Sequence, residues 1–286
     1  MILQNQGLEA FVAIVEAGTV HSAADTLGLT QTAVTQRIKS LESELKLTLF
    51  LRSRRGMALT SDGTALLQYC RAAGELEGVF LSKVSGKTRG DVQLTVVGPT
   101  SAMSTRVATD CLPLYSKHPQ LRLHLRSEDH SNRLELIRKG SADLAIVPAE
   151  NIPNEMDSKL IKPDRYLLVA SASWRGRKLS EILERERVID FYENDSTTTN
   201  YLKYFGLNKQ LKRDRLFVNS NQALLQLISA GVGFGTLTDS MARPHIEAGS
   251  IIALNKAQAV DEPLALVWYP RTQKPEYFTA LLSAIK

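Results

Sequence analysis

Residues 19–45, TVHSAADTLGLTQTAVTQRIKSLESEL, carry the pattern that most restricts how this chain can fold. Steps of three and four bring the apolar side chains of the first half, from Val20 to Leu27, onto one helical face. Gly28 follows at a position where helices often end in a left-handed turn. Thr19 and Thr30 each precede a helical pattern and can cap it. The stretch therefore predicts two short helices joined by a tight turn.

The second of these helices has two contrasting faces. Steps of three and four predict burial of Val34, Ile38, Leu41 and Leu45. Short or bidentate hydrogen-bonding groups cover the opposite face near the helix start, where a recognition helix reaches base edges. Those residues are Gln31, Thr32, Thr35, Gln36 and Lys39. An ordinary amphipathic surface helix would show a similar pattern, so the surrounding sequence has to decide between the two interpretations.

Two short apolar segments around an arginine-rich turn follow, in residues 49–60, LFLRSRRGMALT. They predict a small hairpin, or wing, one element past the recognition helix. Arg52, Arg54 and Arg55 are then well placed for phosphates or the minor groove. A solvated turn is the alternative interpretation of such a charge run.

Residues 1–90 resemble the N-terminal DNA-binding module of LysR-type transcriptional regulators. The family pattern AA-x-x-LG-[VL]-[ST]-Q-x-A-[VL]-[ST]-x-x-I-x-x-LE-x-x-L matches residues 23–45, and the wing pattern F-x-R-x-x-R-G-x-x-LT-x-x-G matches residues 50–63. The resemblance implies base contacts at Gln31, Thr32, Thr35 and Gln36, with His21 nearby. This chain departs from the family at Thr32, where Pro is frequent, and at His21, where a small hydroxyl residue is frequent.

Charge alone does not establish DNA binding. The chain of 286 residues has a net charge of +5 and a pI of about 9.1, which suits nucleic acid without proving it. Residues 1–90 hold ten Lys and Arg against eight Asp and Glu, so the surplus is not concentrated at the front. The argument for DNA therefore rests on the local placement of the wing arginines.

The expected environment is the cytoplasm. The N-terminus lacks the basic and apolar segments of a signal peptide, and no apolar run is long enough to span a bilayer. Cys70 and Cys111 lie far apart in the sequence, which indicates buried thiols in a reducing compartment and not a disulfide framework.

Residues 60–90 predict a linker helix followed by a polar hinge. Apolar residues recur at steps close to those of a coiled-coil seam, namely Leu66, Tyr69, Ala73, Leu76, Phe80 and Val84. A helix buried within one domain would also show this pattern. Its position between a DNA reader and a separate domain favours dimerisation, in which two recognition helices would read an imperfect palindrome.

Residues 91–286 predict two α/β lobes. A strand–helix alternation over residues 92–147 implies parallel strands covered by helices, and a second unit follows. The expected fold is an α/β chain: a winged helix-turn-helix domain (1–59), a linker (60–90) and a periplasmic-binding-protein-like effector domain (91–286). Lobe I was expected at about 91–162 plus 268–286, and lobe II at about 163–267. Residues 134–147 and 220–237 resemble motifs of the LysR-type effector domain.

A cleft between such lobes lies at the carboxyl ends of the strands. The residues expected there are Thr100, Ser101, Ser127, Val147, Ala149, Asn194, Ser196, Asn219 and Phe234. Thr100 and Ser101 open a helix, where free N–H groups favour a carboxylate; Ser101 as a plain N-cap is the alternative.

Acidic segments at Glu128–Asp129 and in residues 191–195, FYEND, suit a cationic effector such as a basic amino acid. This half also faintly resembles the arginine- and lysine-responsive branch of the family. Solvated acidic loops are the competing interpretation.

Other functional classes fit less well. No nucleophile–base set, metal-ligand spacing or phosphate loop is present, so neither catalysis nor a cofactor is expected. A solute-binding protein, or an architectural DNA-binding protein without a ligand, remains the alternative. The sequence favours a transcription factor controlled by a small molecule, acting as a homodimer or homotetramer with RNA polymerase as a further partner and with no role at a membrane.

Overall fold

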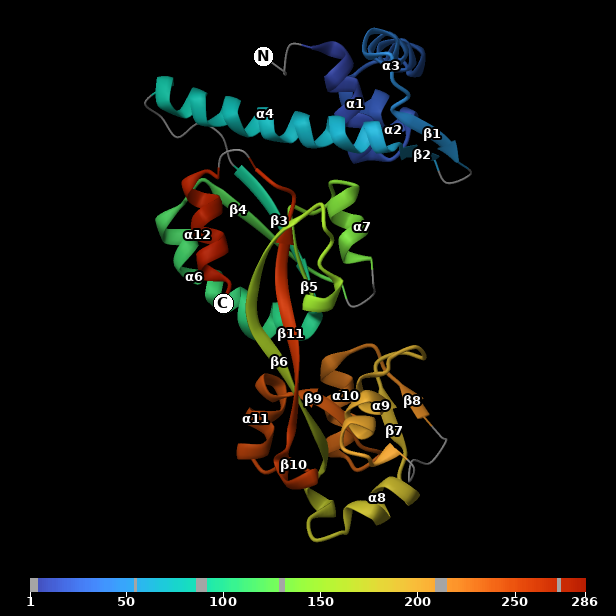
Figure 1. The fold of residues 1–286 in the computed structure, drawn as a ribbon, viewed down its shortest axis with the longest axis vertical. Helices are drawn as coiled ribbons and strands as arrows, with labels where there is room; N and C mark the ends of the chain where they lie inside the picture. Colours follow the sequence, from blue (N-terminus) through green and yellow to red (C-terminus); the bar gives the residue numbers. More distant parts are fainter. Residues whose placement is uncertain (1–4, 54–55, 86–91, 129–131, 209–214, 272–273) are drawn as a thin grey trace.

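The computed structural model describes residues 5–53, 56–85, 92–128, 132–208, 215–271 and 274–286. Figure 1 shows three parts along the long axis: a helical N-terminal domain, one lobe beneath it and a second lobe at the far end. A long helix lies between the N-terminal domain and the first lobe. No helix among the described residues is long and apolar enough to cross a membrane.

The N-terminal domain contains three helices and a hairpin. The helices are α1 (Gln6–Ala17), α2 (Val20–Leu27) and α3 (Gln31–Leu45), and the strands are β1 (Phe50–Ser53) and β2 (Gly56–Leu59), which pair antiparallel. Their shared core includes Phe11, Ala23 and Val34, and each of these side chains is buried. The fully buried Ala23 is small enough to let α1 and α3 approach α2 closely.

The turn between α2 and α3 forms as the sequence predicted. Thr19 Oγ1 accepts a hydrogen bond from Ser22 N, and Thr30 Oγ1 accepts one from Ala33 N, each at 3.1 Å. Gly28 has φ of 64°, in the left-handed region where glycine has no steric cost. The expected burial of Leu45 was wrong: it is 40% exposed, because α3 ends there and extends past the domain core.

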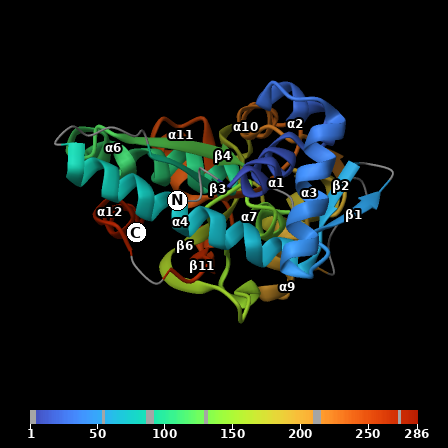
Figure 2. The same cartoon turned by 90° about the horizontal axis from the view of Figure 1, so that it is seen from above.

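Helix α4 (Ser61–Ser85) has 25 residues and, at 1.5 Å per residue, is about 37 Å long. Leu67 and Cys70 pack into the core of the N-terminal domain. Seen from above, the helix runs from that domain across the first lobe (Figure 2). Of the predicted seam, Leu66 and Ala73 are half-buried and Tyr69 is exposed, while the side chains of Leu76, Phe80 and Val84 lie outside the described ones.

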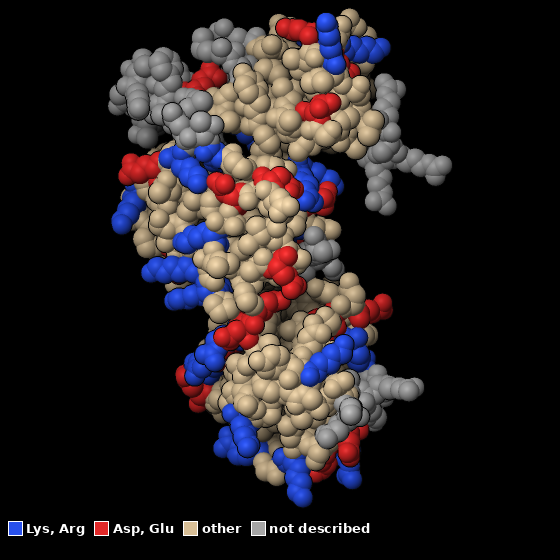
Figure 3. All heavy atoms as spheres, in the orientation of Figure 1, with Lys and Arg blue, Asp and Glu red and all other residues tan. Residues whose placement is uncertain are grey.

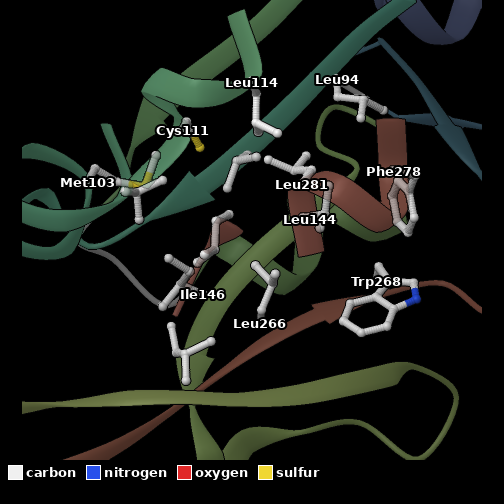
Figure 4. Close-up of a cluster of buried hydrophobic side chains, with 14 of the residues drawn as sticks. Leu94, Met103, Cys111, Leu114, Leu144, Ile146, Leu266, Trp268, Phe278 and Leu281 are labelled. Carbon is white, nitrogen blue, oxygen red and sulfur yellow. The ribbon is translucent and has the colours of Figure 1, made fainter. Parts of the chain in front are cut away.

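Lobe I is built on parallel strands. Strand β3 (Val92–Gly98) pairs in parallel with β4 (Leu121–Ser127) and with β5 (Leu144–Pro148), as the strand–helix alternation predicted. Helices α6 (Ala108–Lys117) and α12 (Glu276–Ala284) pack together on one face of the sheet, and α7 (Arg133–Arg138) covers the other (Figure 1). Figure 4 shows the core between the sheet and α12, where Phe278 and Leu281 lie near Leu144.

Two long antiparallel strands pass from lobe I into lobe II. They are β6 (Asp157–Ser171) and β11 (Ala259–Trp268), and Asp164 faces Glu262 across them. The register shifts between Glu262 and Leu264, at Pro263, which cannot donate to the strand ladder. Residues 264–267 were expected in lobe II, but Leu264 and Leu266 pack in the core of lobe I. The crossing therefore comes earlier on β11 than expected.

Lobe II surrounds the far halves of β6 and β11. Strands β9 (Gly235–Thr238) and β10 (Ile251–Ala253) pair with β6, and β7 (Val188–Asp190) pairs in parallel with β8 (Arg215–Phe217). Helices α8 (Leu179–Arg185), α9 (Thr197–Tyr204), α10 (Asn221–Ser229) and α11 (Asp239–Glu247) cover these strands. The carboxyl end of β7 and the start of α10 face the first lobe through the cavity described below.

Candidate DNA-binding face and effector cavity

The start of α3 presents a polar face to solvent. Gln31, Thr32, Gln36 and Lys39 are exposed and Thr35 is half-buried, so the residues predicted to contact DNA share one accessible surface. The Gln31 amide Nε2 lies 3.0 Å from His21 Nδ1, which ties the first turn of α3 to α2. His21 also lies 3.7 Å from Asp25. In the DNA-free protein, the contact with His21 therefore holds the Gln31 side chain against α2.

The wing is fixed to α3 by a carboxylate. Glu42 Oε1 accepts hydrogen bonds from Leu49 N at 2.7 Å and Phe50 N at 3.4 Å, so the hairpin begins at a set distance from the recognition helix. Arg54 and Arg55 lie outside the described residues, as does the side chain of Arg52. Phosphate contact by these arginines stays a prediction.

A cavity of about 190 Å³ lies between the two lobes. This volume is below the roughly 300–1,000 Å³ of sites for drug-sized ligands, so it suits a small metabolite. Among the described residues that line it, Asp190, Asp195 and Glu262 carry negative charge and Arg133 carries positive charge. Figure 3 shows Asp and Glu side chains gathered beside the hollow between the lobes.

The wall contributed by lobe I and the crossing strands combines an arginine, a hydroxyl and a carboxylate. Ser101 follows β3 in the first turn of a helical segment, and its hydroxyl donates to Asp164 Oδ2 at 3.4 Å. Asp164 is also paired with Arg106 at 3.0 Å. Glu262 lines the cavity beside Tyr166, whose hydroxyl donates to Glu262 Oε2 at 3.4 Å.

The helical segment that Ser101 opens is irregular. A π-helical turn at Met103–Val107 interrupts it between α5 (Thr100–Ala102) and α6. Thr105, in this turn, accepts a hydrogen bond from Ser240 of lobe II at 3.2 Å. Turns of this kind are frequent at functional sites, and this one lies where the two lobes meet.

The wall contributed by lobe II centres on a buried aspartate. Asp190 ends β7, and its side chain is 1% exposed. Arg215 Nε donates to Asp190 Oδ2 at 2.7 Å, and the same guanidinium donates to the carbonyls of Glu193 and Asp195. Asp195 caps the following helix, because its carboxylate accepts from Phe191 N and from Thr197 N and Oγ1.

Burial raises the pKa of three carboxyls in or beside the cavity, those of Glu262, Asp164 and Asp190. It raises the pKa of Glu262, and the charge of Asp164 acts in the same direction, while Tyr166 and Arg133 oppose it. Burial likewise raises the pKa of Asp164 and of Asp190 above the usual range, against Arg106 for the first and Thr198 and Arg215 for the second. Such shifts cluster at binding sites, because burial without a full set of partners disfavours the charged form.

The residues expected in the cleft lie in different places. Ser101 lines the cavity, as do Phe191, Tyr192 and Asp195 of the acidic segment. Val147 and Phe234 are buried in the cores of the lobes. Thr100, Ser127, Ala149, Asn194, Ser196 and Asn219 do not line the cavity. Of the acidic pair at 128–129, Glu128 faces Arg126 at 3.8 Å, and Asp129 lies outside the described residues.

Several lining residues were missed by the sequence analysis, namely Arg133, Tyr166, Asp190, Asn221 and Glu262. Asp190 stands at the end of a short apolar strand, and a buried carboxylate there is a signal that could have been used. Tyr166 and Glu262 lie within long strands, away from the strand ends, and no motif in the neighbouring sequence predicts that they line a cavity.

Comparisons with known proteins agree with this architecture. The profile described as "Bacterial regulatory helix-turn-helix protein, lysR family" matches residues 6–64, and the one described as "LysR substrate binding domain" matches residues 88–286. The chain belongs to the LysR family of transcriptional regulators. Its members bind DNA through the first domain and a small-molecule effector through the second, and they are regulators, not enzymes.

Individual relatives of this LysR-family chain cover most of its length. The RuBisCO operon transcriptional regulator of Allochromatium vinosum is 25% identical over 87% of this chain and 83% of its own. LysG of Mycobacterium tuberculosis is 26% identical over 87% of this chain and 82% of its own.

Solved structures show the same fold. ArgP from Mycobacterium tuberculosis has a TM-score of 0.80 at 24% identity, covering 98% of this chain and 94% of its own. Full-length LysG from Corynebacterium glutamicum with bound effector Arg has a TM-score of 0.74 at 23% identity, covering 100% of this chain and 96% of its own.

Proposed function

We propose that this LysR-family regulator binds a basic amino acid, arginine or lysine, in the cavity between its lobes. The observation that supports this is the balance of charge: three carboxylates and one arginine line the cavity among the described residues. A basic amino acid carries one carboxylate and two cations, so its charges are the inverse of that lining. Asp195 accepts hydrogen bonds from Phe191 N and Thr197 N. We therefore assign the two cations to Glu262 and to Asp190 Oδ1, since Arg215 already binds Asp190 Oδ2. Arg133, which also donates to Glu128 O, supplies the positive charge for the carboxylate.

The relatives lend separate support to this proposal. The structure of LysG from Corynebacterium glutamicum, which shares the fold, has arginine as its bound effector.

The DNA-binding part of the proposal assigns roles to the exposed face of α3. Gln31, Thr32, Thr35 and Gln36 read bases, with Lys39 and His21 beside them, and the wing arginines contact phosphates. The protein acts in the cytoplasm as a homodimer or homotetramer through α4, on an imperfect palindrome, and contacts RNA polymerase there.

Calorimetry on the full-length protein tests the ligand class. L-arginine and L-lysine are titrated against the neutral L-citrulline and L-norleucine, which keep the α-amino acid head and lack the side-chain charge. We expect a measurable dissociation constant for at least one basic amino acid and at least tenfold weaker binding of both neutral analogues. Absence of binding by arginine and lysine, or equal affinity for the neutral analogues, would overturn the proposal.

A further inference from the structure

Two buried polar atoms on the lobe II wall have no hydrogen-bond partner among the described residues. They are Asp190 Oδ1 and Asn221 Nδ2, and both residues line the cavity. Asp190 ends β7, and Asn221 is the first residue of α10. A buried polar atom without a partner destabilises the ligand-free protein, so a ligand that supplies the missing partner binds more tightly.

Arg215 cannot supply that partner. Its guanidinium is held by Asp190 Oδ2 and by the carbonyls of Glu193 and Asp195, and it stacks on Phe217, 5.1 Å from the ring centroid. These contacts hold Asp190 Oδ2. Oδ1 has no hydrogen-bond partner among the described residues, because the nearby Thr198 hydroxyl is paired with Thr236 at 3.0 Å. The Asn221 amide nitrogen makes no hydrogen bond to the described residues, so a half-turn about the last side-chain torsion can present the amide oxygen to the cavity instead.

The opposite wall suits the other end of an amino acid. The α-carboxylate and α-ammonium are attached to one carbon, so their partners must be a cation and an anion that lie close together. Arg133 and Glu262 are the cation and the carboxylate that line this side of the cavity. Ser101 adds a hydroxyl on the same wall. The side-chain cation, several bonds away, then extends toward lobe II.

We propose that Asp190 and Asn221 form the subsite that reads the side-chain cation, while Arg133 and Glu262 hold the α-amino acid head. This assignment rests on the proposed function and deepens it. Selectivity for a charged side chain then resides in lobe II, and affinity for α-amino acids in general resides in lobe I and the crossing strands. A bound ligand bridges the two lobes.

The test measures dissociation constants of the full-length protein for lysine, arginine and norleucine, which has no polar group at the end of its side chain. Asp190→Asn should weaken the binding of the basic amino acids at least tenfold and leave that of norleucine unchanged. The ratio of the dissociation constant for norleucine to that for a basic amino acid therefore falls at least tenfold. Glu262→Gln should weaken all three by a similar factor and preserve the ratio.

A second variant guards against misfolding of Asp190→Asn, which leaves Arg215 without its charged partner. Asn221→Ala removes an amide whose nitrogen makes no hydrogen bond to the described residues. It should weaken the binding of the basic amino acids several-fold and leave that of norleucine unchanged. Asn219→Ala is the matched control, because Asn219 is exposed, two residues away and outside the cavity lining. It should change nothing.

The outcomes separate this inference from the proposed function. If wild-type protein binds neither lysine nor arginine, both fall. If wild type prefers basic amino acids but neither Asp190→Asn nor Asn221→Ala changes the ratio to norleucine, only the subsite assignment falls. If this ratio falls in Glu262→Gln and is unchanged in Asp190→Asn, the ligand lies in the reverse orientation and the subsite assignment is wrong.

Discussion

Glu262 is placed unfavourably in the ligand-free protein. It faces the carboxylate of Asp164 across β6 and β11, and like charges in directly opposed positions destabilise a sheet. Arg106 and Ser101 compensate Asp164, whereas the side-chain hydrogen bond of Glu262 is a long one from Tyr166. A cation bound beside Glu262 would remove the repulsion between the two carboxylates, so the arrangement suits a cation site.

Replacing Glu262 with Gln should therefore stabilise the ligand-free protein while weakening effector binding. The folded-state pKa of Glu262 is raised above the ordinary value of 4.5 for a glutamate, so ionisation of the wild-type residue costs stability as the pH rises from 4.5 through the folded-state pKa. The gain in melting temperature of Glu262→Gln should be absent at pH 4 and should grow as the pH rises above 4.5. Thermal melts across this range check it; a gain that does not depend on pH would contradict the assignment.

Gln31 is the residue of α3 whose proposed base contact is easiest to test. Gln31→Ala should relax base preference at one position of the site, by about 1–3 kcal/mol, while non-specific binding stays nearly unchanged. Selection of bound sequences from a random DNA pool, for the variant and the wild type, measures this. The groove assignment would be wrong if the base preferences of the two proteins were identical. His21→Ala can be compared in the same experiment, because it removes the imidazole whose Nδ1 lies 3.0 Å from Gln31 Nε2.

Sequence patterns predicted some of these residues and not others for a physical reason. Ser101 and the polar face of α3 were found because each follows a local signal, the start of a helix. Glu262 and Tyr166 come together only when two strands about a hundred residues apart align beside a register shift. Asp190 joins them from a third strand, β7, through the packing of lobe II. Phe234 followed the same strand-end rule as Ser101, but the bridge of Val188 to Phe234 draws it into the core of lobe II.

At the scale of elements, α4 has two faces with different tasks. Leu67 and Cys70 anchor it to the N-terminal domain, and Tyr69 on the other face is 59% exposed. The predicted dimer seam runs through that exposed face. The start of the helix was predictable from its sequence, whereas the π-helical turn in lobe I was not, because its hydrogen-bond shift depends on tertiary packing.

Tyr69→Glu should weaken the proposed dimer, since a charge at the seam would be desolvated on association. The midpoint of dimer dissociation, measured by analytical ultracentrifugation, should move to at least tenfold higher concentration. Tyr69→Phe keeps the apolar ring and should leave the midpoint unchanged. An unaltered midpoint in Tyr69→Glu would place the dimer contact elsewhere.

Two glycines in α4 give opposite expectations for the same substitution. A Cβ at Gly63 would lie 2.2 Å from the carbonyl oxygen of Leu49, whereas one at Gly74 would meet nothing within 4 Å. Gly63→Ala should lower the free energy of unfolding by about 1–3 kcal/mol through overpacking. Gly74→Ala should raise it by about 0.5–1 kcal/mol through helix propensity. Chemical denaturation compares them, and equal effects would contradict the close packing of α4 at Gly63 against the backbone of Leu49.

At the scale of the whole molecule, the cavity and the DNA-binding domain are joined through lobe I. Glu262 lies on β11, which pairs with β5. Asp143 directly precedes β5 and lies 3.7 Å from Arg71 of α4 and 3.6 Å from Arg271, while its Oδ2 accepts from Thr95 N. We expect a ligand that bridges the lobes to shift β6 and β11 relative to each other. The Arg71–Asp143 ion pair can pass that shift from lobe I to α4, the helix that positions the DNA-binding domain. Effector and DNA then select among the same conformations.

The most direct test of this account is the affinity of the full-length protein for arginine and lysine, measured with and without saturating specific DNA. Linkage requires that a regulator controlled by its effector shows different values in the two cases, typically by a factor of about 5–150. We predict a difference in that range for wild-type protein. A basic amino acid that binds with the same dissociation constant whether or not DNA is present would contradict the account.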